Sequence, residues 1–332
     1  MSKMIDARGL TKAFEKSNKV VDGASFSVTE GEVFSLLGPN GAGKTTTIRM
    51  LTTLTRITEG SALIGGYDVS SSHQMEVRRI IGVVPQDVTL DNELKGIENL
   101  LLAAKLQHVP GRAARERAMD LLALVDLADF AERRVATYSG GMKRRLQVVA
   151  ALIHQPKILF LDEPTVGLDI QTRTKMWDYI LTLKEQGKTI FMTTHYLEEA
   201  DKLSDAVAIM DCGKIVVEGS PSQLKESLQG DVLTIAVDGD RDITGYLESF
   251  PGVREVNRKD HRYLLKLTKA ESALPGIITG VASMNVKITE TSFSKSTLDQ
   301  VFLEATGRSM RDAEEGSRNH DGYALVHTRE SG

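Results

Sequence analysis

The chain has 332 residues, of which 41% are apolar and 26% charged, and its formal net charge is −4. This is the composition of a globular protein of about two domains, and it lacks the basic excess that marks a nucleic-acid-binding surface. The single cysteine, Cys212, excludes an internal disulfide framework and a cysteine-based metal cluster.

Short apolar stretches rich in β-forming residues recur along the first 220 residues. They predict buried strands at 33–37, 80–84, 158–161, 189–193, 207–210 and 215–217. Apolar residues with helical spacing predict two helices, over 91–107 and 112–127. Strands separated by helices indicate an α/β fold with a parallel sheet, which a helical subdomain interrupts between about residues 87 and 155.

The pattern changes after residue 230. The order there is a strand, a helix, two strands, a helix and a strand, at 232–237, 243–250, 253–257, 262–267, 271–282 and 286–290. This βαββαβ order predicts a small ferredoxin-like α+β domain. A last helix is expected over 297–306. We therefore expect a first domain over 1–229, a second over 230–307 and a flexible, polar tail over 308–332.

Residues 38–45 fit the phosphate-binding pattern G-x-x-x-x-G-K-[ST] completely. Small residues in such a loop let successive backbone N–H groups surround phosphate oxygens, and the following helix directs its positive end at them. In this pattern Lys44 reaches the β- and γ-phosphates, and Thr45 binds Mg²⁺. The motif predicts ATP and Mg²⁺ as ligands, with candidate contacts from Gly38, Pro39, Asn40, Gly41, Ala42, Gly43, Lys44, Thr45 and Thr46.

Two acidic residues follow the predicted strand 158–161. Asp162 stands where a carboxylate that holds the metal is needed, at the carboxyl end of a strand near the phosphate loop. Glu163 is then expected on the γ-phosphate side, where its carboxylate can take a proton from the attacking water as a general base.

The segment Tyr138-Ser139-Gly140-Gly141-Met142 resembles the signature motif of ABC ATPases, usually written LSGGQ, with Tyr138 in place of leucine and Met142 in place of glutamine. It precedes a helix, so it can form a second phosphate-binding helix N-terminus. The resemblance implies that Ser139, Gly140 and Gly141 close on ATP held by a second copy of the cassette, which makes an ATP-dependent homodimer the expected partner.

Four further positions match the same family. Gln86 resembles the Q-loop residue that contacts Mg²⁺ and water and senses the membrane partner, and Asp169 resembles the D-loop aspartate. His195 resembles the switch histidine that contacts the γ-phosphate. Phe14 matches the aromatic residue that stacks on adenine.

Three cations, Lys143, Arg144 and Arg145, stand near the start of the signature helix. The helix dipole disfavours positive charge there. Two interpretations remain open: the cations form a solvated helix face, or some of them lie near the nucleotide phosphates of the partner cassette.

Within the family, three segments resemble the daunorubicin-resistance type of drug-exporter ATPase, which pairs with an ABC-2-type permease: the signature, residues 91–100 (DNELKGIENL) and residues 297–307 (TLDQVFLEATG). The resemblance implies an ATP-hydrolysing subunit on the cytoplasmic face of the membrane that powers drug or antibiotic export. The apolar stretches, such as 148–153, are far shorter than the ~20 residues of a membrane helix. A separate permease must therefore supply the pore.

Three alternatives stay open. The same ATPase could serve lipid or polysaccharide export, because contacts to the cargo belong to the permease. A soluble ABC ATPase acting on ribosomes or DNA is disfavoured by the single cassette and by the short helical insertion. A regulatory nucleotide-binding module without turnover is disfavoured by Glu163.

Overall fold

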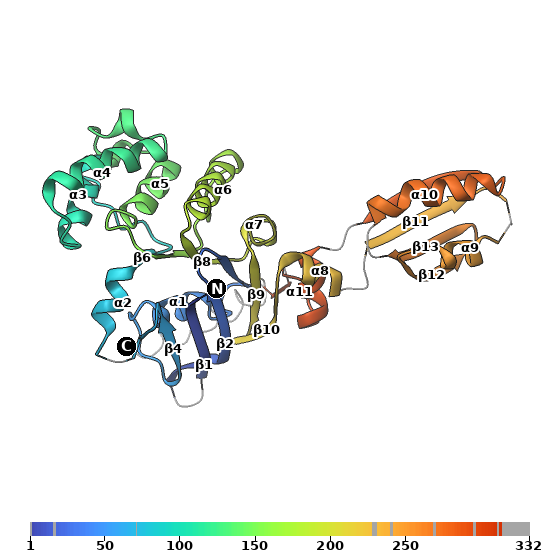
Figure 1. Ribbon diagram of the computed structural model, residues 1–332, viewed down its shortest axis with the longest axis horizontal. Helices are drawn as coiled ribbons and strands as arrows, with labels where there is room; N and C mark the ends of the chain where they lie inside the picture. The colour runs from blue at the N-terminus through green and yellow to red at the C-terminus, as the bar shows by residue number, and fades with distance from the viewer. Residues whose placement is uncertain are drawn as a thin grey trace, which may run out of the picture. The chain divides into compact units, whose positions relative to one another are not determined.

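The computed structural model describes residues 2–15, 18–70, 72–227, 231–239, 242–267, 270–294, 297–310 and 312–313. The chain forms two compact units (Figure 1). Of the described residues, unit 1 comprises those up to Glu218 together with those from Met310, and unit 2 comprises those from Gly219 to Ser309.

Unit 1 begins with an antiparallel sheet that the sequence analysis did not predict. Its strand order is β2-β1-β4-β5, formed by β1 (Lys3–Glu15), β2 (Asn18–Thr29), β4 (Glu59–Ile64) and β5 (Tyr67–Asp68). In β2, Ala24, Phe26 and Val28 alternate inward, as expected for a sheet with one buried face. The register of β1 against β2 shifts at several points, so the alternation is broken along β1 and is weak in the sequence.

The second sheet of unit 1 carries the predicted strands, in the order β10-β9-β3-β8-β7-β6. The strands are β3 (Val33–Leu37), β6 (Ile81–Val84), β7 (Ile158–Asp162), β8 (Thr189–Thr194), β9 (Ala206–Asp211) and β10 (Lys214–Gly219). β3 pairs in parallel with β8 and β9, and β7 pairs in parallel with β6 and β8. Every residue of β3, β7 and β8 is buried, which explains their continuous apolar runs. The predicted parallel sheet is confirmed, with strand ends within two residues of those expected.

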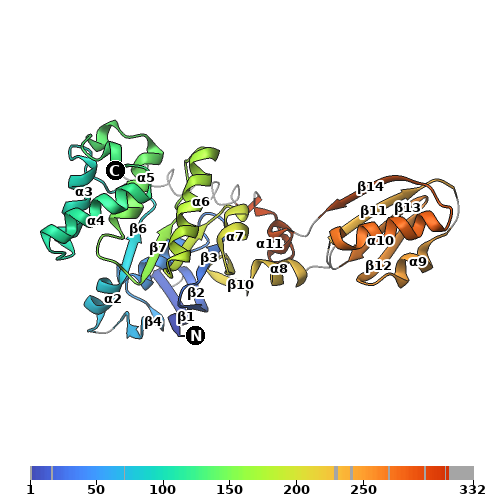
Figure 2. The same ribbon diagram turned by 45° about the horizontal axis from the view of Figure 1, so that its top comes forward.

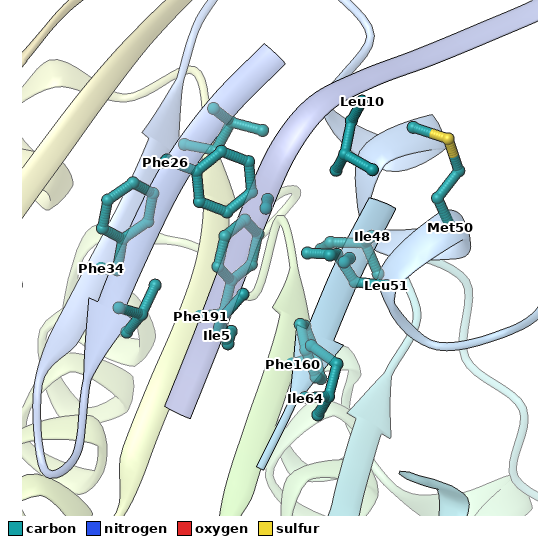
Figure 3. Packing of buried hydrophobic residues seen from close by; sticks show 14 of the residues in the cluster. Ile5, Leu10, Phe26, Phe34, Ile48, Met50, Leu51, Ile64, Phe160 and Phe191 are labelled. Atoms are coloured by element: carbon teal, nitrogen blue, oxygen red, sulfur yellow. The ribbon is translucent and has the colours of Figure 1, made fainter. Parts of the chain in front are cut away.

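The two sheets of unit 1 share an aromatic core (Figure 3). Phe26 of the antiparallel sheet stacks on Phe34 of β3 at 5.3 Å between ring centroids. Phe34 stacks in turn on Phe191 of β8 at 5.5 Å, and Phe160 of β7 lies 5.5 Å from Phe191. These rings join the strands whose ends carry the site.

The helices of unit 1 fall into two groups. The helical subdomain holds α3 (Gly96–Leu106), α4 (Gly111–Leu124) and α5 (Gly140–Ala150), which pack together around their own apolar cluster, with the short 3₁₀ turns η1 (Ala128–Phe130) and η2 (Val135–Thr137) (Figure 2). The remaining helices are α1 (Lys44–Leu51), α2 (Gln74–Ile80), α6 (Ile170–Glu185) and α7 (Leu197–Leu203).

The first predicted helix, over 91–107, begins later than expected, at Gly96. The Glu98 side chain accepts a hydrogen bond from the Lys95 N–H at 2.8 Å and so caps the helix there. Upstream, the Asp91 side chain accepts from the Glu93 N–H at 2.8 Å, which stabilises a local turn instead of a helix.

Unit 2 contains the predicted βαββαβ arrangement. Its elements are α8 (Pro221–Ser227), β11 (Asp231–Val237), α9 (Thr244–Ser249), β12 (Val253–Lys259), β13 (Arg262–Leu267), α10 (Ala270–Ser283), β14 (Ile288–Ser294) and α11 (Leu298–Thr306). The strand order β12-β13-β11-β14, with antiparallel pairs throughout, is the ferredoxin-like topology. The two inner helices pack their apolar residues, such as Leu247 and Ile277, on one face of the sheet.

The compact units divide after Glu218, whereas the sequence analysis expected the boundary at 229/230. The difference is α8, which packs against α11 and so belongs to unit 2. Residues 228–230 lie outside the described residues, as do 311 and 314–332 of the expected tail. Met310 and Ala313 are buried, so the packed chain extends beyond residue 307. Across the described ranges, no helix combines the length and apolarity needed to cross a bilayer.

The aromatic core yields a stability prediction. Phe191 is fully buried and contacts three other rings, so Phe191→Ala should destabilise unit 1 by about 3–5 kcal/mol through lost burial and a residual cavity. Phe14→Ala is the matched control, because Phe14 is 65% exposed and its loss should change stability by only about 0.5 kcal/mol. Denaturant unfolding measures both variants, and equal midpoints would contradict the assignment of this core.

Candidate functional site

The phosphate loop runs from the end of β3 to the start of α1. Gly38, Pro39, Ala42 and Gly43 are buried, Asn40 and Gly41 are exposed, and Thr46 is half-buried in α1. Gly43 has φ = 105°, and a Cβ at this position would lie 2.6 Å from the Val20 carbonyl oxygen, so only glycine fits at this turn. The loop therefore has the close backbone packing that the motif predicts, next to the β1–β2 hairpin.

The Lys44 ammonium lies inside this loop. The residue is only 4% exposed, and Nζ donates hydrogen bonds to the carbonyl oxygens of Gly38 at 2.7 Å and Pro39 at 3.0 Å. Nζ also forms an ion pair with Oε1 of Glu163 at 3.3 Å. A buried ammonium held by main-chain carbonyls and one carboxylate is a point charge ready to bind phosphate.

Thr45 and Asp162 meet although 117 positions separate them in sequence. The Thr45 hydroxyl donates to Oδ1 of Asp162 at 3.1 Å. The Thr193 hydroxyl of β8 donates to the same carboxylate oxygen at 2.6 Å. Because Asp162 ends β7 and Thr193 lies opposite it on β8, parallel pairing places these oxygen atoms at one edge of the sheet.

Glu163 has a left-handed backbone, with φ = 46°. Its N–H donates to the Thr193 carbonyl oxygen at 3.2 Å and to the Thr193 hydroxyl at 3.1 Å. Its carboxylate Oε2 accepts a long hydrogen bond from Nε2 of Gln86 at 3.4 Å and lies 3.3 Å from Nδ1 of His195. The structure thus gathers Lys44, Gln86 and His195 around the carboxylate of Glu163, the residue predicted to be the base.

Burial raises the pKa of the Glu163 carboxyl, but His195 and Lys44 beside it lower that pKa by more. The net result is a pKa below the ordinary value for glutamate. The carboxylate is therefore ionised at neutral pH, as a general base must be.

The signature segment forms a separate surface. Ser139 is exposed and caps α5, where its hydroxyl accepts from the Met142 N–H at 3.2 Å. Gly140 is exposed beside it. Gly141 lies against α6: an added Cβ would come within 2.4 Å of the Thr172 side chain. This exposed helix N-terminus can accept an anion from outside the chain.

Asp169 and Phe14 occupy exposed positions. Asp169 caps α6, where its carboxylate accepts from the Thr172 N–H at 3.0 Å and from the Thr172 hydroxyl at 2.7 Å. These bonds hold the pKa of Asp169 below its ordinary value. Phe14 lies on β1 and its side chain is largely exposed, so its ring is accessible for stacking, although the Lys12 ammonium lies 5.0 Å from the ring centroid.

One member of the cation cluster contradicts the solvated-face interpretation. Lys143 and Arg145 are half-buried, but Arg144 is only 3% exposed, and all of its described hydrogen bonds are to groups inside unit 1. The sequence contained a signal for this: Val148 and Leu152, four and eight residues later, continue an apolar stripe through Arg144.

Glu199 of α7 is a further buried acid, and sequence reasoning missed it. Its Oε1 accepts from the Thr165 hydroxyl at 2.8 Å and from the Trp177 indole N–H at 3.0 Å. Burial raises the pKa of Glu199 above its ordinary value. The residue links the segment before Asp169 to α6 and α7.

An apolar groove of about 380 Å³ lies between the helical subdomain and the end of α1. Leu54 and Leu106 line it and are largely exposed, with Leu106 at 72%. Gln147 and His154 of the segment that begins with α5 also line it. Exposed apolar side chains around a groove are typical of a surface that another protein covers.

Comparison with known families matches both units. The ABC transporter family model matches residues 21–166, and the model of the C-terminal domain of DrrA1-3-like ATP-binding proteins matches residues 219–306. Among solved structures, the chain is similar to a dimeric bacterial ABC transporter cassette, at 28% identity and a TM-score of 0.60, over 65% of this chain and 98% of the other. A dimeric post-hydrolysis cassette bound to ADP and Pi gives 27% identity and a TM-score of 0.60, over the same shares.

Curated relatives extend the likeness over nearly the whole chain. The daunorubicin resistance ATP-binding protein DrrA3 of Streptomyces coeruleorubidus is 39% identical over 88% of this chain and 93% of its own length. The linearmycin resistance ATP-binding protein LnrL of Bacillus subtilis is 34% identical over 93% of this chain and 100% of its own length. The Nod factor export ATP-binding protein I of Burkholderia lata is 38% identical over 93% of this chain and 98% of its own length. The chain therefore belongs to the ABC transporter family, as a nucleotide-binding, ATP-hydrolysing subunit of the daunorubicin-resistance type.

Proposed function

We propose that this ATPase powers the export of a drug or antibiotic through a separate ABC-2-type permease. The observation that carries the proposal is the meeting of Lys44, Asp162, Glu163 and His195 at the carboxyl ends of β3, β7 and β8. The resistance proteins among its relatives support the drug as cargo.

Thr45, Asp162 and Gln86 would hold Mg²⁺ with the nucleotide. The donor set fits this ion, because a hydroxyl and a carboxylate oxygen already lie 3.1 Å apart and Mg²⁺ prefers oxygen ligands. When bound, the ion would neutralise phosphate charge. The glycine-containing loop and the start of α1 would bind the phosphates, and Phe14 would stack on the adenine.

Glu163 would act as the general base. Its carboxylate pairs with Lys44, which is the same cation that the γ-phosphate needs. Binding of the phosphates to Lys44 would release Glu163 to take a proton from water, while His195 steadies the carboxylate from its other side.

A second copy of the chain would complete the site. Ser139 is exposed at the N-terminus of α5, and its hydroxyl caps its own helix. A helix N-terminus that faces outward can bind the γ-phosphate held by a partner cassette. In the same closed dimer, Asp169 of the exposed D-loop would lie near the shared interface.

The groove beside Leu54 and Leu106 would receive an apolar segment of the permease. The protein would thus be peripheral on the cytoplasmic face of the membrane, where ATP is available. The net charge of −4 disfavours a nucleic-acid partner. A second candidate function is the same ATPase role for lipid or polysaccharide export; the Nod factor export relative, which is not a drug-resistance protein, gives this candidate weaker support.

Glu163→Gln should leave ATP binding intact and lower the hydrolysis rate by about 10²–10⁴-fold, because the amide cannot accept the proton. ATP that is bound but not hydrolysed should hold two copies of the chain together, so a dimer should accumulate. Adding Ser139→Ala should weaken this dimer by roughly 1–3 kcal/mol per site, because a hydrogen bond to a charged group is lost. Phosphate release and light scattering with and without Mg·ATP measure both effects. Lys44→Ala serves as the control that abolishes nucleotide binding.

The export role is tested in cells that express the chain with its permease. Efflux of an anthracycline should require Glu163. Cells that express the Glu163→Gln variant should accumulate the drug to the same level as cells without the transporter. If cells retain equal amounts of the drug with and without the wild-type chain and its permease, the drug-export proposal fails and lipid or polysaccharide export becomes the proposed role. Parent-rate hydrolysis by Glu163→Gln would assign the base to another residue.

The second domain should be dispensable for the chemistry. All candidate phosphate contacts precede Gly219, so a chain ended after Gln229, at the boundary expected from the sequence, should still bind ATP with near-parent affinity. Titration with a fluorescent ATP analogue measures this. A folded truncation without affinity would place part of the nucleotide site in unit 2.

A further inference from the structure

Arg144 lies on α5, five residues after Ser139, and its guanidinium is buried behind the turn Asp162–Pro164, here called the catalytic turn because it carries the proposed base. Nε donates to the Pro164 carbonyl oxygen at 2.8 Å. Nη2 donates to the carbonyl oxygens of Asp162 at 2.8 Å and Glu163 at 2.9 Å. Three successive main-chain carbonyls at the end of β7 therefore converge on one side chain.

The other edge of the same guanidinium holds the Q-loop. Nη1 donates to the carbonyl oxygens of Pro85 at 2.6 Å and Gln86 at 3.1 Å, and to Oε1 of Gln147 at 2.9 Å. Gln147 in turn donates to the Asp87 carbonyl oxygen at 2.7 Å. One residue thus joins the signature helix, the Q-loop and the catalytic turn.

This set of acceptors requires arginine. A guanidinium offers five N–H donors in a planar fork, whereas a lysine ammonium offers three donors from one point. Burial lowers the pKa of Arg144 to about 10, against the opposing influence of Asp162 and other nearby carboxylates, so the group stays charged at neutral pH.

The contacts fall where the backbone is strained. Glu163 has φ = 46°, a conformation that a non-glycine residue keeps only when its surroundings hold it there. On one side, its N–H is bound by Thr193. On the other, Arg144 binds the carbonyls before, at and after the strained position. The direction of the Glu163 side chain therefore depends on where α5 holds Arg144.

We propose that Arg144 is a positioning residue that fixes the Glu163 turn and the Q-loop to the signature helix. Contact between Ser139 and the ATP held by the partner cassette then determines the position of Glu163, the base of the subunit that carries Ser139. The inference rests on the proposed function, in which Glu163 is the base and Ser139 contacts the partner's nucleotide. A helix rises 1.5 Å per residue, so about 7.5 Å of rigid helix separates the two residues. A displacement of the signature is therefore transmitted to the turn with little loss.

The test compares substitutions in the full chain, assayed with its permease. Arg144→Met removes all the donors, and Arg144→Lys keeps the stem and the charge. Arg145→Met is the matched control: Arg145 follows on the same helix, its side chain is only 13% exposed, and it donates to the Val125 carbonyl oxygen at 2.7 Å, away from the site. For each variant, kcat, KM, ATP affinity and thermal stability are measured.

We expect Arg144→Met to lower kcat about 10²-fold, which is the loss expected when a general base is misplaced, with ATP affinity within about twofold of the parent. Arg144→Lys should recover part of kcat. Arg145→Met should lower thermal stability and leave kcat close to the parent value. If Arg144→Met does not fold, Arg144→Lys is compared with Arg145→Met instead, because the three donors of lysine can still bind some of the main-chain carbonyl oxygens that Arg144 binds.

A double variant separates positioning from general destabilisation. If Arg144 acts through Glu163, then Arg144→Lys combined with Glu163→Gln should hydrolyse ATP no more slowly than Glu163→Gln alone, since coupled residues give non-additive effects. Additive losses, unchanged kcat in a folded Arg144 variant, or an equal loss in Arg145→Met would each overturn the inference. Parent-rate hydrolysis by Glu163→Gln alone would instead refute the proposed function, so the two failures are distinguishable.

Discussion

Parallel pairing of β3, β7 and β8 is the constraint on which the site depends. Because parallel strands end at the same edge of a sheet, the loop after β3, the acids after β7 and the histidine after β8 must converge. Asp162 lies opposite Thr193, and Leu37 lies opposite Thr194, so the register brings together groups that are distant in sequence, such as Thr45 and Asp162, which are 117 positions apart. The aromatic core beneath fixes that register, since a shift by one residue would turn each buried ring away from its neighbours.

The polar groups at this edge form one connected system rather than independent contacts. Thr193 binds both the Asp162 carboxylate and the Glu163 N–H, and Arg144 holds the carbonyls of the same turn. A buried network of this kind is rigid when all its members are bonded, and rigidity is what the proposed role of Glu163 as a base requires. The signature surface, Asp169 and the aromatic ring of Phe14 are exposed, which suits groups whose partners come from outside the chain.

The sequence predicted the buried strands and the βαββαβ unit because continuous apolar runs and regular alternation are local patterns. It did not reveal the antiparallel sheet of β1, β2, β4 and β5, since register shifts interrupt the alternation in β1. It placed the start of α3 about five residues early, because the apolar period continues through a segment that Glu98 and Asp91 hold outside the helix. The limit between the units also differs, because the packing of α8 on α11 is a contact between distant segments.

The sequence by itself determined the chemistry: which residues could bind phosphate, hold a metal and take a proton, because those roles follow from side-chain type at a fixed local spacing. Tertiary structure alone decided how these residues are held. Lys143, Arg144 and Arg145 look alike in sequence, yet successive helical residues point about 100° apart, and the position of the neighbouring strands determined that Arg144 is buried behind the catalytic turn. The left-handed backbone of Glu163 likewise depends on Thr193 and Arg144, which the fold brings to it from distant parts of the chain.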